Sequence, residues 1–214
     1  MDLPQIANTI LSWKNRQERS VGSRFVVGIA GPPASGKSSL ADRLCAELAE
    51  SGSSTPAVVP MDGYHLDNAV LTSHGLLAKK GAPETFDADG FIRDLQRLRN
   101  PRGAVYVPVF DRGLDLARAA GREIGPEIDT VLVEGNYLLL DRSPWSSGRA
   151  VFDLSIMLTV PEPVLLDRLI KRWRDHGHDA RAAEERARGN DLVNARVVGR
   201  ESVQADLIVS SDEG

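Results

Sequence analysis

The chain alternates between short runs of consecutive apolar residues and longer segments in which apolar residues recur every three to four positions. The apolar runs are 24–30, 56–61, 130–135, 153–160 and 205–210. Such runs, without polar alternation, predict strands buried on both faces. Helical spacing occurs in between, at 38–50, 91–99 and 162–176. Buried strands that alternate with helices predict an α/β fold with a doubly wound, mainly parallel sheet.

Residues 63–128 show less of this regularity and are the best candidate for an insertion that covers a substrate. Its one extended run, 105–110, contains Pro108, which favours an edge position or a strand end because proline cannot donate to a sheet ladder. No interdomain linker, internal repeat or low-complexity tract is evident. We therefore expect one domain spanning 1–214.

The first 20 residues are amphipathic and charged, which is unlike a signal peptide. One helical face that could dock on the domain is formed by Ile6, Ile10, Leu11 and Trp13. No stretch approaches the roughly 18 apolar residues of a membrane helix. We expect a cytoplasmic protein that does not bind membranes.

Composition and charge narrow the candidate partners. The 214 residues are 42% hydrophobic, and the formal net charge is −4. A chain of this length can bury a substantial core. Without a basic excess, nucleic acid is not an expected partner. The single cysteine, Cys45, excludes an internal disulfide and suits a reducing compartment.

A phosphate-binding motif lies between the first predicted strand and the first predicted helix. The segment reads GPPASGKSS, in which residues 31–38 match G-x-x-x-x-G-K-[ST]. Such a loop points successive backbone N–H groups at a phosphate, at a helix N-terminus. Lys37 can reach the β- and γ-phosphates, and the Ser38 hydroxyl can ligate Mg²⁺. The predicted ATP-binding residues are Gly31, Ala34, Ser35, Gly36, Lys37, Ser38 and Ser39.

The loop alone does not separate a kinase from a switch or a motor. No N-K-x-D segment, typical of guanine-binding proteins, follows it, and the chain is small for a mechanochemical ATPase. Transfer to a small acceptor is the better explanation. That chemistry also needs an acidic group near the metal, a base or positioning group for the acceptor hydroxyl, and cations over the γ-phosphate.

Two predicted strands end in carboxylates, and parallel strands place such groups at one edge of the sheet. Glu134 ends the apolar run 130–135 and is the candidate metal-side carboxylate, with a structural hydrogen bond to the phosphate loop as the alternative. Asp62 follows the run 56–61. It can orient an acceptor hydroxyl and accept its proton late in the reaction. The alternative for Asp62 is an ordinary Asp-Gly turn.

Two nearby polar residues are further candidates for binding the acceptor. His65 could donate or accept hydrogen bonds there, although a structural role is equally compatible with its position. Asn136 follows Glu134 by two residues. Both would lie near the edge of the sheet where the strands end.

Segment 162–200 is the candidate lid. Arg168 and Arg172 lie four residues apart and share a helix face, so they could close over the phosphates. Most of the charged residues that follow are better explained as a solvated, ion-paired helix. Arg168 and Arg172 are therefore the predicted catalytic cations, together with Lys37.

With these parts in place, the chain resembles the P-loop kinases of the uridine kinase, phosphoribulokinase and pantothenate kinase superfamily. The similarity is greatest to bacterial nucleoside/nucleotide-kinase-like proteins that are often labelled kinases of fructose transport systems. The segments that carry the resemblance are GPPASGKSS, MDGYHLDNAVL, KKGAPETFDADGF, VPVFDRGLD, VEGNYLLLD and the arginine-rich segment ending NDLVNARVV. They span residues 24–200, so the resemblance covers the whole domain.

The resemblance implies a P-loop fold with an acceptor-binding cap, with ATP·Mg²⁺ as the phosphate donor. It assigns Asp62 the role of base and Arg168 and Arg172 the lid position. The segment that shapes the acceptor pocket matches Lys80, Gly81, Pro83, Glu84 and Asp87. Asp111 and Arg112 stand where related kinases carry a Tyr- or His-containing acceptor loop. This departure weakens the case for pantothenate or uridine as the acceptor.

The sequence thus predicts an ATP-dependent kinase acting on a hydroxyl of a small metabolite, with a sugar such as fructose as the first guess. A pantothenate- or nucleoside-type kinase is the first alternative. A non-catalytic, nucleotide-binding regulatory module is the alternative from another class. A homodimer is left open.

Overall fold

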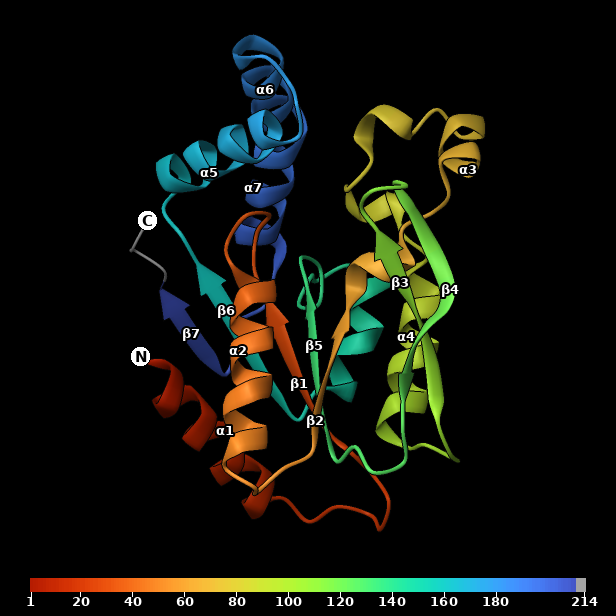
Figure 1. Cartoon of the computed structure of the whole chain (residues 1–214), viewed down its shortest axis with the longest axis vertical. Helices are drawn as coiled ribbons and strands as arrows, with labels where there is room; N and C mark the ends of the chain where they lie inside the picture. The colour runs from red at the N-terminus through yellow and green to blue at the C-terminus, as the bar shows by residue number, and fades with distance from the viewer. Residues whose placement is uncertain (211–214) are drawn as a thin grey trace.

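A five-stranded parallel sheet forms the centre of the computed structural model, which describes residues 1–210 (Figure 1). Its strand order is β2-β5-β1-β6-β7. The bounds are β1 Phe25–Ala30, β2 Pro56–Pro60, β5 Thr130–Gly135, β6 Leu154–Thr159 and β7 Leu207–Ser210. β1 and β5 are buried along their whole length. The predicted α/β fold with a doubly wound parallel sheet is confirmed.

Two layers of helices cover the sheet. On one face lie α1, Leu3–Arg16, and α2, Lys37–Glu50, which pack against side chains such as Val27 and Ile29. On the other face lie α4, Ala88–Arg99, the 3-10 segment Trp145–Val151, and α7, Leu192–Glu201. The predicted docking helix at the N-terminus is therefore α1, with Ile6 and Ile10 fully buried. Figure 1 shows that α1 and α2 lie next to each other.

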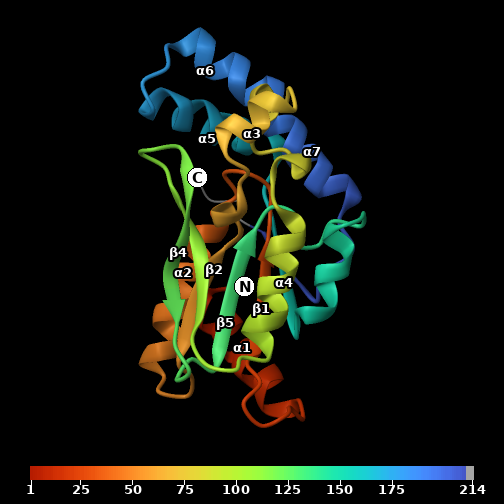
Figure 2. The same cartoon turned by 90° about the vertical axis from the view of Figure 1, so that its right-hand side faces the viewer.

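A separate two-stranded sheet lies beside β2. It pairs β3, Val105–Asp111, with β4, Leu116–Ile124, in an antiparallel hairpin whose register shifts between Val107 and Val109. The irregularity falls at Pro108, as expected for a residue without a backbone donor. β4 was not predicted. Arg122 of β4 donates a hydrogen bond to the carbonyl oxygen of Val58, so the hairpin is tied to the outer edge of the main sheet (Figure 2).

Two helical groups rise beyond the carboxyl ends of the strands (Figures 1 and 2). One contains α5, Glu162–Asp175, α6, Ala180–Arg186, a single π-helical turn, Ala187–Asp191, and the start of α7. The other contains α3, Asn68–Ser73, and the 3-10 turns Leu77–Lys79 and Pro83–Thr85. The part of the chain that the structure describes has no helix long and apolar enough to cross a membrane. The boundaries predicted for the insertion and the lid stay predictions.

Candidate active site

The phosphate loop connects β1 to α2, as its motif predicts. Gly36 adopts a left-handed conformation with φ of +90° and stands at the N-cap of α2 without a side-chain cap. The first N–H groups of α2 therefore stay available for an anion. The Ser35 hydroxyl oxygen is buried and has no hydrogen-bond partner within the described chain. These features give the loop the geometry of a phosphate cradle, with Lys37 and Ser38 in the first turn of the helix.

Glu134 lies at the end of β5, next to the loop. In the sheet register it pairs with Ile29 of β1 on one side and Pro60 of β2 on the other. Its side chain is buried, with 5% of the residue exposed. Burial raises the pKa of Glu134 above its ordinary value, and the opposing effects of the Lys37 charge and a hydrogen bond with Ser38 only partly offset this.

Ser38 and Glu134 supply oxygen donors of the kind that a divalent cation takes. Residues 1–210 contain no group of three or more His, Cys, Asp or Glu side chains that could hold a metal alone. Mg²⁺ in phosphotransferases commonly takes one or two protein oxygens and completes its shell with phosphates and water. A hydroxyl hydrogen-bonded to a buried carboxylate matches that pattern, so the donor set suits Mg²⁺ bound together with a nucleotide.

Asp62 lies in the 3-10 turn Met61–Tyr64, directly after β2. Its carboxylate accepts a hydrogen bond from Arg112 at the tip of the hairpin, at 2.9 Å. Burial alone would raise the pKa of Asp62, but the positive charges of Lys37, Arg112 and Arg172 outweigh burial and hold it below its ordinary value. Asp62 is therefore ionised at neutral pH and electrostatically coupled to the phosphate loop, the hairpin and the lid.

His65 lies beside Asp62 and packs between two aromatic rings. Its ring lies 4.1 Å from the ring of Phe86 and 4.7 Å from that of Phe110, measured between centroids. The ring Nδ1 atom is 2.8 Å from the carbonyl oxygen of Asp62. Burial lowers the pKa of His65, so the imidazole is neutral at physiological pH. A neutral ring between two aromatic side chains has one nitrogen left for a further hydrogen bond.

Lys80 is engaged in a network of protein contacts. Its ammonium group is 2.8 Å from the Asp115 carboxylate and donates to the Asn68 side-chain oxygen at 2.7 Å. Only 13% of the Lys80 side chain is exposed. Lys80 therefore ties α3 to the tip of the hairpin, an interaction that the sequence did not predict. Its proposed contact with the acceptor stays a prediction.

The other predicted acceptor residues fall into two groups. Asp111 accepts hydrogen bonds from the backbone of Gly113 and Leu114, so its carboxylate shapes the hairpin turn. Glu84 is half-exposed, with Arg142 at 3.9 Å. Asn136, by contrast, is buried, and its side-chain oxygen has no partner within residues 1–210. Of these three side chains, Asn136 is the strongest candidate for contact with a ligand, because buried polar atoms without a hydrogen-bond partner are rare.

The lid arginines lie on the side of α5 that faces the phosphate loop. Arg168 donates to the carbonyl oxygen of Ala34 at 3.5 Å. Arg172 contributes to the positive potential at Asp62. The roles predicted for Arg168 and Arg172, as lid cations that close over the phosphates, stay predictions.

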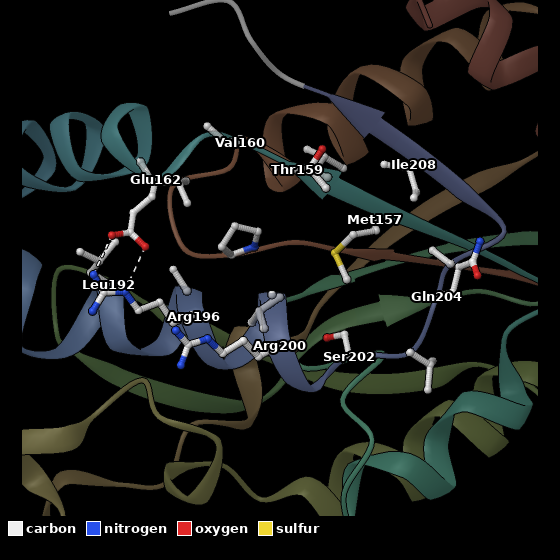
Figure 3. Close-up of a pocket in the computed structure, with 18 residues that line it drawn as sticks. Met157, Thr159, Val160, Glu162, Leu192, Arg196, Arg200, Ser202, Gln204 and Ile208 are labelled. Carbon is white, nitrogen blue, oxygen red and sulfur yellow. Dashed lines mark hydrogen bonds and ion pairs between the residues drawn. The ribbon is translucent and has the colours of Figure 1, made fainter.

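A cavity of about 560 Å³ lies away from Asp62, between α7 and strands β6 and β7 (Figure 3). Its walls are mainly apolar, with Met157 and Ile208 on the sheet side. An ion pair between Arg196 and Glu162, at 2.6 Å, closes one end. The cavity touches the phosphate loop only at Pro32 and includes none of the predicted catalytic residues.

Comparison with known proteins identifies the class. A solved structure of a "putative fructose transport system kinase" from Silicibacter superposes with a TM-score of 0.92 and 44% identity, covering 98% of this chain and 99% of that one. A "putative uridine kinase" of Schizosaccharomyces pombe is 32% identical over 87% of this chain and 83% of its own length. A pantothenate kinase of Nitrobacter hamburgensis is 36% identical over 78% of this chain, which spans only 55% of that protein. No family model matches the chain.

The fold and site define an ATP-dependent kinase of the P-loop class. The chain belongs to the P-loop kinase superfamily that includes the uridine kinases and pantothenate kinases, as the sequence resemblance implied. It is therefore a kinase-type phosphotransferase.

Proposed function

We propose that this kinase transfers the γ-phosphate of ATP, bound with Mg²⁺, to a hydroxyl of a small polyol, with a sugar such as fructose as the first candidate. The observation that carries this proposal is the placement of two carboxylates, Asp62 and Glu134, on neighbouring strand ends beside Lys37. Their pKa values are shifted in opposite directions, which separates their roles.

On the donor side, the backbone of the phosphate loop binds the β- and γ-phosphates and Lys37 neutralises part of their charge. Ser38 and Glu134 hold the metal, directly or through water. Mg²⁺, when bound, neutralises charge on the phosphate oxygens. Arg168 and Arg172 bind the transferred phosphoryl group from the lid side and exclude water from it.

On the acceptor side, the ionised Asp62 carboxylate accepts the proton of the acceptor hydroxyl. The hydroxyl oxygen forms a bond to the γ-phosphorus while the bond from phosphorus to the β–γ bridging oxygen breaks, which releases ADP. Because an aspartate of lowered pKa is a weak base, it accepts the proton late, in a loose transition state. Arg112 fixes one carboxylate oxygen, which leaves the other for the hydroxyl.

The wall of the acceptor pocket favours a polyol. Phe86 and Phe110 hold the ring of His65 between them, so His65 offers an acceptor hydroxyl a hydrogen-bonding group that packing keeps in place. Hydroxyl groups can donate to the unpartnered oxygen of Asn136 and to the Nε2 atom of His65, which is left as an acceptor because Nδ1–H donates to the Asp62 carbonyl oxygen. The name of the Silicibacter relative points the same way.

A pantothenate- or nucleoside-type acceptor is the second candidate. The names of the Nitrobacter and Schizosaccharomyces relatives favour it. A regulatory module without catalysis is the third reading. Against it stand Asp62, Glu134 and the lid arginines, which such a module would not need.

The test is an ADP-release assay with Mg²⁺ over sugars, nucleosides and pantothenate, using the wild type and Asp62→Asn. We expect one acceptor class to stimulate ADP release. Asp62→Asn should lower kcat by roughly 10²–10⁴-fold, the usual contribution of a positioned base, while ATP still binds. The matched control is Asp67→Asn, a nearby residue that caps α3, where asparagine caps equally well.

Three outcomes would contradict parts of this proposal. Slow ATP turnover that no acceptor stimulates, and that Asp62→Asn does not change, would favour the regulatory module. Stimulation by pantothenate or nucleosides alone would replace the sugar. Phosphorylation at the normal rate by Asp62→Asn would remove Asp62 from the role of base.

A further inference from the structure

The turn at Lys80 and Gly81 is where the lid meets residues 79–87, the proposed acceptor segment. Asn190, in the π-helical turn, donates from its side-chain nitrogen to the carbonyl oxygen of Lys80 at 2.8 Å. Asn190 and Lys80 are 110 positions apart along the chain. Asn194, one helical turn later, is 4% exposed, and its side-chain nitrogen lies 3.4 Å from the Asn190 oxygen. The lid thus presents two stacked amides to this turn.

The other side of the turn is held by the end of the main sheet. Tyr137, which is fully buried, donates from its hydroxyl to the carbonyl oxygen of Gly81 at 2.5 Å. Gly81 itself has φ of +100°, a conformation that residues with a side chain rarely adopt. The two consecutive carbonyl groups of this turn are therefore bound by two different parts of the molecule, Asn190 of the lid and Tyr137 of the segment after β5.

A series of hydrogen bonds and backbone pairings connects this turn to Asp62, the proposed base. The Gly81 N–H donates to the Thr85 hydroxyl at 2.9 Å, and Thr85 is fully buried. The Thr85 carbonyl oxygen accepts from Leu66 at 3.0 Å, and Phe86 pairs with His65 in a β-bridge. His65 in turn contacts the Asp62 carbonyl oxygen. The position of the turn therefore bears on the position of Asp62 and His65.

Within the lid, Asn190 is connected to the phosphate-facing helix. Trp173 of α5 donates from its indole nitrogen to Asp191, the residue after Asn190, at 2.6 Å. Trp173 follows Arg172 on the same helix, and the Arg186 guanidinium lies 4.4 Å from the Trp173 ring centroid. π-helical turns inside helices are frequent at functional sites. Here the turn contains Asn190, whose side chain reaches across to the carbonyl oxygen of Lys80.

We propose that Asn190 is a positioning residue: it holds the Lys80–Gly81 turn against the lid, so that nucleotide bound under Arg168 and Arg172 fixes the acceptor segment 79–87. The acceptor then binds a pocket that nucleotide has pre-organised. This inference rests on the proposed function and adds a route from donor to acceptor. Asn190 itself touches neither substrate.

Hydrogen exchange tests the proposal without any knowledge of the acceptor. Backbone exchange of residues 79–87 is measured in the wild type with and without Mg²⁺ and a non-hydrolysable ATP analogue. We expect nucleotide to slow this exchange about fivefold, the equivalent of one buried hydrogen bond. In Asn190→Asp, which keeps the size of the side chain but replaces the donor nitrogen by oxygen, the slowing should fall below about twofold, with analogue affinity unchanged within about threefold.

The control variant is Arg188→Ala, in the same π-helical turn. Arg188 pairs with Glu184 on the exposed face of the lid, and among the described residues no hydrogen bond or ion pair joins it to residues 79–87. It should keep the nucleotide-dependent slowing of the wild type. Once the acceptor is known, Asn190→Asp should raise the KM for the acceptor and leave the KM for ATP unchanged, a split that general destabilisation of the lid would not produce.

Equal slowing in the wild type and Asn190→Asp would overturn the inference, and so would nucleotide binding that leaves residues 79–87 unaffected in the wild type. Loss of the slowing in Arg188→Ala would also overturn it, since the effect would then belong to the lid in general. These outcomes leave the proposed function standing. A chain that does not bind the analogue at all would instead overturn the proposed function, and the inference with it.

Discussion

The donor side and the acceptor side of this kinase are built in different ways. The donor side centres on one short contiguous segment, residues 31–38, whose backbone makes the phosphate cradle, and Glu134 lies beside it. The proposed acceptor side is assembled from the turn after β2, the hairpin β3–β4, the segment 79–87 and Asn136 after β5. Side-chain contacts such as Arg112–Asp62 and Lys80–Asp115 join several of these parts. A local motif fixes the donor chemistry, whereas the acceptor chemistry depends on tertiary contacts that can change independently.

The largest expected effect on ligand binding is on the donor side. Lys37→Ala removes a charge-assisted contact to the phosphates, worth about 1.5–3 kcal/mol, and should weaken ATP binding by roughly 10- to 100-fold. The fold should be unaffected, because Lys37 lies in the first turn of α2 with its side chain at the site. Calorimetric titration of the Mg²⁺–ATP analogue measures the effect.

The matched control is Lys171→Ala, which removes a lid ammonium that pairs with Asp175 on the exposed surface. Its affinity for the analogue should equal that of the wild type. An equal loss in both variants would mean that net charge, and not the position of Lys37, controls nucleotide binding.

Two glycines with similar backbone conformations, one on the donor side and one on the acceptor side, allow the two sides to be compared directly. Gly36 has φ of +90° and Gly81 has φ of +100°. Replacing either by alanine costs about 1–3 kcal/mol of conformational strain. Gly36→Ala should weaken the binding of the ATP analogue, whereas Gly81→Ala should leave that binding intact and raise the acceptor KM.

Thermal unfolding and steady-state kinetics separate the two glycine variants. If Gly81→Ala impaired nucleotide binding as severely as Gly36→Ala, the two sides would form one cooperative unit, and the contrast between them would disappear. A variant at Gly199, which is helical and has open space around it, should be neutral or slightly stabilising as alanine.

This contrast explains how much of each side could be predicted from the sequence. The phosphate loop, Asp62 and Glu134 are recognisable because each lies at the end of an apolar run. β4 was not predicted, since its residues are mostly exposed and lack a buried face. The Lys80–Asp115 ion pair and the Asn190–Lys80 hydrogen bond join segments far apart along the chain. No local pattern records such contacts, because packing of the whole domain brings the partners together.

Glu134→Gln should stabilise the free protein at neutral pH. A carboxyl group whose folded-state pKa is raised contributes stability only at low pH, and that contribution is lost as pH rises through the folded-state pKa. Near pH 7.5 the buried carboxylate is therefore unfavourable, and the neutral amide removes this cost. A gain of about 1 kcal/mol would raise Tm by about 2–4 °C in a domain of this size.

The difference in Tm between Glu134→Gln and the wild type is measured by thermal unfolding from pH 4 to pH 8, without nucleotide or Mg²⁺. It should be largest at the alkaline end and shrink towards pH 4. A difference that stays constant with pH would show that packing, and not ionisation, accounts for it. Kinase activity should fall in the same variant, because the donor side would lose its metal-side carboxylate.

Arg112→Ala should have the smallest effect of these variants. It tests whether Arg112 only supports Asp62 or also binds the acceptor. The Arg112–Asp62 ion pair is half-exposed on the arginine side, and such pairs contribute about 0–1 kcal/mol. Removing the guanidinium raises the pKa of Asp62 towards its ordinary value, so Asp62 stays ionised at neutral pH. We expect kcat/KM for the acceptor to change less than about fivefold, and less still at high salt, because salt screens exposed pairs.

Arg118→Ala, which breaks the neighbouring pair with Asp111, is the control. A rise in acceptor KM far beyond fivefold, absent from Arg118→Ala, would mean that Arg112 binds the acceptor directly, and the hairpin would then be a source of specificity as well as a support for the base.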